Sequence, residues 1–286
     1  MHDLIIEPLR APFMRRAVLE VVLLGLLGGV VGVHVMLRRL SFLTEVVQHT
    51  VFPGIAIAFA FGQSLLLGAL VTGIASVLLL GALARRRRID ADAAMAVLFA
   101  VFLAVGVVVV SRRRGFQADL TALLFGRILA VDARQLVETA IIAVACIVAI
   151  AIVHKELVLR AFDPAGAEAM GYPLTRLDLL LDVVVALAVI AGIRAMGTVL
   201  AVALIITPAA TAQLLSRRIG VQMAVAALIG ALGGWVGLVI AWDASVNHDV
   251  RLAPGATVVV VLTALFAVAA IATSVARRVS LRRAAA

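Results

Sequence analysis

Nine apolar segments, each about 20 residues long, occupy most of this 286-residue chain. About 20 apolar residues in a helix are enough to cross a hydrocarbon core of ~30 Å. No water is available at that depth for backbone polar groups, and the alternating pattern of a barrel strand is missing, so we expect helical spans. The predicted fold class is all-α, a polytopic helical membrane protein. The segments lie at about 17–37, 43–62, 64–84, 91–111, 135–154, 177–196, 197–216, 221–242 and 255–276.

Composition separates this chain from soluble proteins. It is 64% hydrophobic and 14% charged, with a mean hydropathy of +1.19. The formal charge of +9 raises the question of nucleic acid, but the arginines gather at the ends of apolar segments and are not interleaved with aromatics. That distribution is typical of the positive-inside rule. We therefore expect a lipid bilayer as the surroundings and no nucleic-acid partner.

The arginine clusters predict the topology. They place residues 85–88, the loop 155–175 and the tail 277–286 in the cytoplasm, and alternation places residues 243–254 outside. Nine crossings put the N-terminus outside, with residues 1–16 as an interfacial amphipathic helix and not a removed signal. One re-entrant or broken segment would reduce the count to eight. The best candidate for it is 197–216, which Pro208 interrupts; the alternative stays open.

Glu45 and His49 are the most informative polar residues of the spans. They lie four residues apart, so their side chains share one face of a helix. With Arg39 at the cytoplasmic end of this span, the pair falls near the membrane midplane. Ionisable groups at that depth face a bundle interior or a polar path, and carboxylate and imidazole both bind divalent transition metals. The pair predicts a metal path through the membrane; a buried polar pair between helices is the alternative.

Proline and glycine follow the pair directly. Pro53 and Gly54 free backbone groups and permit a kink, as expected in a helix that lines a path. We expect Pro208 to have the same role in the segment 197–216. A proton relay formed by Glu45 and His49 would use the same features, so a proton-coupled secondary transporter is a second hypothesis. A third is a membrane subunit that only anchors a complex, which leaves the midplane pair unexplained.

A short helix is predicted between two spans. Asp163 is a good N-cap, Pro164 fits the first helical position, and Gly171 suits the residue after the helix end. An isolated helix of about two turns is not stable, so it must dock on its own bundle or on a cytosolic partner. We expect Ala167 to lie on its exposed face of small side chains.

The sequence lacks the motifs of an enzyme. Lys155 is the only lysine and follows no glycine-rich loop, and no zinc-protease or hydrolase motif is present. We therefore expect no catalytic residues, no permanently bound cofactor, and ATP hydrolysis, if any, on a separate chain. The single cysteine, Cys146, excludes an intrachain disulfide.

Several stretches, in order along residues 13 to about 260, resemble the membrane permease subunits of zinc, manganese and iron ABC importers. Two departures stand out: Glu45 replaces the usual Asp, and Gln48 replaces a common Ser. The matching residues are Arg38-Arg39, Ser41-Phe42, Glu45, His49 and Pro53-Gly54; Asp119-Leu120 and Leu124 to Val131; Phe162-Asp163, Ala167 and Gly171; and Gly197, Leu200 and Pro208 to Ala212.

The resemblance implies a single permease domain over residues 1–286 in the cytoplasmic (inner) membrane of a prokaryote. It also implies a second, identical permease subunit, two cytosolic ATPase subunits and an extracytoplasmic metal-binding protein as partners. Glu45 and His49 would bind the transported zinc or manganese, and Asp163, Ala167 and Gly171 would belong to the coupling helix. Weaker ligand candidates are Asp178, Asp182, His248 and Asp249.

Overall fold

The computed structural model describes residues 11–84, 91–111, 128–248, 250 and 252–284. Every regular element in these ranges is helical, and nine stretches are long and apolar enough to cross a membrane, which confirms the predicted fold class. The elements are α2 (Pro12–Leu37), α3 (Ser41–Thr50), α4 (Phe52–Ala60), α5 (Leu65–Ala84), α6 (Ala91–Ser111), η1 (Ile128–Ala130), α8 (Ala133–Ile152), α9 (His154–Phe162), α10 (Pro164–Ala169), α11 (Leu174–Met196), α12 (Thr198–Leu215), α13 (Ile219–Asn247) and α14 (Pro254–Ala284).

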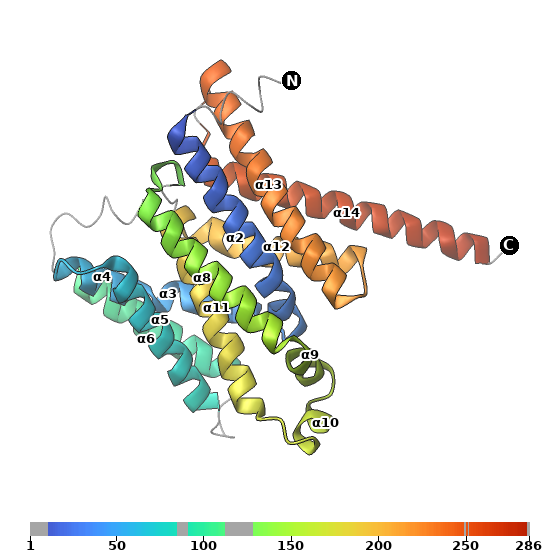
Figure 1. Cartoon of the computed structure of the whole chain (residues 1–286), viewed down its shortest axis with the longest axis horizontal. Helices are drawn as coiled ribbons and strands as arrows, with labels where there is room; N and C mark the ends of the chain where they lie inside the picture. Colours follow the sequence, from blue (N-terminus) through green and yellow to red (C-terminus); the bar gives the residue numbers. More distant parts are fainter. Residues whose placement is uncertain (1–10, 85–90, 112–127, 249, 251, 285–286) are drawn as a thin grey trace.

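Helix α2 lies at the centre and contacts α8, α11, α12 and α13 (Figure 1). Two glycine pairs make this packing possible. Gly25 and Gly29 lie against the backbone of α13, and Gly28 and Gly32 lie against that of α12. Each pair has the spacing of the small-residue motif by which membrane helices approach closely. A Cβ at Gly29 would overlap the backbone of Ala227, so close approach here requires glycine.

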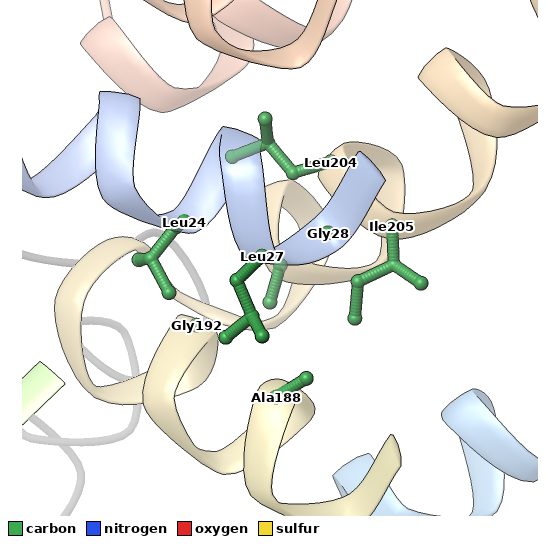
Figure 2. A pocket seen from close by; sticks show the side chains of 8 residues that line it. Leu24, Leu27, Gly28, Ala188, Gly192, Leu204 and Ile205 are labelled. Carbon is green, nitrogen blue, oxygen red and sulfur yellow. The ribbon is translucent and has the colours of Figure 1, made fainter. Parts of the chain in front are cut away.

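The crossing of α2, α11 and α12 leaves only a small apolar gap. Figure 2 shows Leu24 and Leu27 of α2 facing Gly192 of α11, with Leu204 and Ile205 of α12 beside them. The gap measures about 10 Å³. An apolar space of that size is too small and too dry for a hydrated ion. It is a packing gap in the core and not a binding cavity.

The sequence predicted a helix break or kink at Pro53-Gly54 and at Pro208, and only the first site coincides with a change from one helix to the next. Helix α12 runs without interruption through Pro208, so the expectation of a break there is wrong. In the second span α3 ends at Thr50 and α4 begins at Phe52, while Val51 between them keeps helical φ and ψ angles of −74° and −26°. Pro53 has no N–H to donate to the carbonyl of residue 49, which loosens the helix at this point. Whether every span crosses fully stays a prediction.

The chain ends and the peripheral helices complete the arrangement. Residues 12–16 continue directly into α2 and do not form a separate helix. Helices α4, α5 and α6 gather on one side of α2, whereas α13 and α14 lie on the other, and α14 diverges from the bundle toward the C-terminus (Figure 1). The predicted cytoplasmic arginines 85–88 and the N-terminal residues 1–10 lie outside the described residues.

Candidate functional site

Glu45 and His49 lie together on α3. Oε1 of Glu45 is 3.4 Å from Nε2 of His49. Two donor atoms that bind one ion at about 2.1 Å each lie roughly 3.0–3.4 Å apart. The carboxylate and the imidazole are therefore spaced as two ligands of a single metal ion.

Neighbouring helices hold α3 in place around this pair. The ring of Phe99 on α6 meets the His49 ring edge-on, with centroids 4.7 Å apart. One residue after His49, the buried Thr50 hydroxyl donates to Ser76 Oγ on α5 at 2.9 Å, and Ser76 donates to the Gly73 carbonyl at 2.8 Å. These contacts fix the face of α3 that carries the pair.

The pair is open on one side. The Glu45 side chain is 45% exposed and the His49 side chain 30% exposed. Across the described residues, no group of three or more His, Cys, Asp or Glu side chains could hold a metal. Structural or catalytic zinc takes at least three protein ligands, so the Glu45–His49 pair alone has fewer ligands than such a site requires.

Gly54 has a packing role that the sequence did not predict. A Cβ at Gly54 would overlap the Gly68 carbonyl oxygen and the Thr72 side chain of α5. Glycine at this position therefore lets α4 and α5 approach closely just beyond the candidate ligands. A role of Pro53 and Gly54 in lining a path stays a prediction.

The short helix α10 is capped as predicted. The Asp163 carboxylate accepts from the Gly166 N–H at 2.8 Å. Gly171 follows the helix with φ of +82°, and the Tyr172 N–H donates to the Ala167 carbonyl at 3.1 Å. Both bonds are those of a helix N-cap and of a left-handed C-terminal turn. Local sequence was enough to predict these ends.

Ala167 corrects the prediction of an exposed small face. Its side chain is only 1% exposed, so it packs against its own chain. The exposed apolar side chains of this region are Phe162 at 70%, Met170 at 60% and Tyr172 at 38%. Large apolar side chains exposed outside the spans mark an interaction surface. We call Phe162, Met170 and Tyr172 the apolar edge of α10.

Of Asp178 and Asp182, only Asp178 is ion-paired in the described part of the chain. It makes ion pairs with Arg38 at 2.7 Å and with Arg160 at 3.1 Å. Asp182 lies one turn further along α11 and lines a cavity of about 390 Å³ together with Asp178 and Arg38. A ligand role for the two aspartates stays a prediction.

Two ionisable residues of α2, Glu20 and His34, and their partners on other helices were missed by the sequence analysis. Glu20 of α2 is fully buried and accepts from Thr139 of α8 at 2.6 Å. His34 of α2 is 1% exposed, and its Nε2 lies 3.3 Å from Nδ1 of His154. The available signal was the presence of ionisable residues inside an apolar segment.

His248 is the remaining ligand candidate that the structure describes. His248 Nδ1 is 3.8 Å from the Asp243 carboxylate, and the His248 side chain is 66% exposed. Asp119, Leu120, residues 124–127 and Asp249 lie outside the described residues. Nothing here brings His248 close to Glu45 or His49.

Comparisons with known proteins identify the family of this chain. The ABC 3 transport family matches residues 10–273. The manganese transport system membrane protein MntC of Halalkalibacterium halodurans is 35% identical over 257 residues, covering 90% of this chain and 86% of that protein. The chelated iron transport system membrane protein YfeD of Yersinia pestis is 30% identical over 271 residues, covering 95% and 89%.

A solved structure shares the fold. PsaBC from Streptococcus pneumoniae, in complex with Fab, superposes with a TM-score of 0.81 at 28% identity, covering 94% of this chain and 95% of that one. The family match extends over nearly all of the nine apolar helices. This chain, a multi-pass protein of a prokaryotic cell membrane, therefore belongs to the ABC 3 transport family.

Proposed function

We propose that this chain is the permease subunit of an ATP-driven importer for a divalent transition metal ion. The observation that carries the proposal is the Glu45–His49 pair, which has the spacing of two ligands and lies in the second span just before Pro53. The relatives named for manganese and iron transport support a metal as the cargo. They also favour an ATP-driven importer over a proton-coupled transporter.

A second, identical subunit would complete the site. Two copies related by a twofold axis supply two carboxylates and two imidazoles, and the open side of each pair would face that axis. Four N and O donors suit zinc, whereas manganese accepts the same donors with added water. We propose manganese as the main cargo, with zinc and iron as competitors for the same ligands.

The site predicts the effect of removing a ligand. Glu45→Gln or His49→Ala should lower uptake of radioactive manganese by more than about 100-fold, since losing even an outer-shell partner of a metal costs 10- to 100-fold. Uptake is measured in vesicles at limiting metal, with membrane insertion checked in parallel. Asp92→Asn, at an exposed carboxylate of α6, is the matched control. Wild-type uptake in both site variants would refute the proposal.

The proposal includes two cytosolic ATPase subunits and an extracytoplasmic metal-binding protein. No ATP-binding motif is present in this sequence, so another chain must hydrolyse ATP. We propose that the apolar edge of α10 docks on the ATPase, because Phe162 and Met170 are exposed outside the spans.

Met170→Asp should weaken ATPase binding by roughly 10- to 100-fold, because burying an unpaired charge at an interface costs a few kcal/mol. ATPase retention by the purified permease measures the effect, and Met170→Leu, which keeps the apolar volume, is the control. Equal retention by Met170→Asp and wild type would exclude this edge as the docking surface.

A further inference from the structure

Asp178 ties together three elements that are far apart in the sequence. Its Oδ1 accepts from Nη1 of Arg38, which follows α2, at 2.7 Å, and its Oδ2 accepts from Nη2 of Arg160, on α9, at 3.1 Å. Asp178 itself is in the first turns of α11. We call these three residues the Asp178 bridge.

The bridge is stronger than an ordinary surface ion pair. The side chains of Arg38, Arg160 and Asp178 are 14%, 22% and 31% exposed, so water screens them only in part. Each carboxylate oxygen takes one guanidinium, which gives two separate charge-assisted hydrogen bonds. Loss of the carboxylate would leave two neighbouring arginines without their shared counter-charge.

Arg160 connects the Asp178 bridge to α10. Arg160 lies three residues before Asp163, the residue that both ends α9 and caps α10. Helices α9 and α10 are therefore joined through a single residue, and they pack against each other. A displacement of α10 must move the end of α9 that carries Arg160.

Arg38 connects the Asp178 bridge to α3, the helix that carries the candidate metal ligands. Only Arg39 and Leu40 separate Arg38 from the start of α3, which carries Glu45 and His49. This joint is a closed turn, because the Leu40 N–H donates to the Val35 carbonyl at 2.8 Å. Arg39 has φ of +55°, a conformation that costs a residue with a side chain roughly 1–2 kcal/mol and that surrounding contacts must maintain. A turn held in this way transmits movement of Arg38 to α3.

We propose that Asp178 is a positioning residue that passes movement of α10 to the metal-binding helix α3. The inference rests on the proposed function, because it assumes an ATPase that moves α10 and a cargo held by Glu45 and His49. The chemistry requires only that a shared carboxylate keeps Arg160 and Arg38 at a fixed separation. Asp178 acts through these arginines and needs no contact with the metal.

The test uses the complete transporter, reconstituted with its ATPase and binding protein. Arg160→Gln is the milder variant, because it removes only the Arg160–Asp178 ion pair and leaves the Arg38–Asp178 pair intact. Asp178→Asn removes both ion pairs. Manganese transported per ATP hydrolysed should fall about tenfold in each variant, a factor equivalent to 1.4 kcal/mol. ATPase retention and metal binding should match wild type, which a general loss of folding would not allow.

Arg176→Gln is the matched control for Arg160→Gln, because it removes an exposed arginine of α11 that makes no ion pair with any described residue. It should keep the wild-type ratio of metal to ATP, and Asp178→Glu should recover part of that ratio. The inference is overturned if Arg160→Gln keeps the wild-type ratio, or if Arg176→Gln loses as much as Arg160→Gln. A wild-type complex that imports no metal would instead refute the proposed function.

Discussion

Helices α2 and α3 both carry an acid and a histidine inside an apolar span, but these residues differ in burial and in partners. In α2 the two residues are buried and each has a partner on another helix: Glu20 with Thr139 of α8, and His34 with His154 of α9. In α3, Glu45 and His49 pair only with each other among ionisable groups of the described chain, and both side chains are partly exposed. Partners on other helices give the α2 residues a structural role, whereas the α3 pair keeps an open side for the proposed cargo.

The backbones of α2 and α3 also differ in how they pack. Four glycines let α2 contact the backbones of α12 and α13 directly. Helix α3 is only ten residues long, is followed after Val51 by α4 with Pro53 in its first turn, and joins α2 through the strained turn at Arg39. We infer that α2 is the fixed scaffold and that α3 is the element able to change position during transport.

The largest expected effect is a loss of folding from one added methyl group in α2. Gly29→Ala should destabilise the protein by at least about 2–3 kcal/mol, because the new Cβ overlaps the Ala227 backbone. Gly220→Ala, at an exposed glycine of α13 with open space around it, should be neutral or stabilising by up to about 1 kcal/mol from helix propensity. Thermal unfolding in detergent measures both. A stable Gly29→Ala variant would show that α2 is not a rigid scaffold.

A smaller effect on stability should distinguish Glu20 of α2 from Glu45 of α3. Thr139→Val removes the one side-chain hydrogen bond that Glu20 receives from the described residues and should cost about 1–3 kcal/mol, as expected for a buried polar group left unsatisfied. Glu45→Gln should change stability by less than about 0.5 kcal/mol, since it changes a partly exposed side chain. The same unfolding assay compares them. Equal destabilisation by the two variants would remove the distinction between a structural and a functional acid.

Local and periodic signals in the sequence predicted much of this structure. Hydropathy alone located the nine apolar helices, and Asp163 and Gly171 marked the ends of α10 through capping chemistry. The spacing of four residues also placed Glu45 beside His49. Each of these features depends on residues close together in the chain, so neighbours in sequence were enough.

Features that depend on distant contacts could not be predicted. The burial of Ala167 depends on how α10 packs against its own chain, and the continuity of α12 through Pro208 depends on the helices around it. Likewise, only the fold shows that Glu20 meets Thr139, 119 residues away. An ionisable residue in a span looks the same in sequence whether or not its partner exists elsewhere in the chain.

The central claim is that two copies of this chain hold one metal ion between their Glu45–His49 pairs. The most direct test is the number of manganese ions bound per permease chain in the purified complex, measured by elemental analysis for wild type, Glu45→Gln and His49→Ala. The account predicts one ion per two chains in the wild type and none at this site in either variant. One ion per chain, or binding that survives both substitutions, would contradict it.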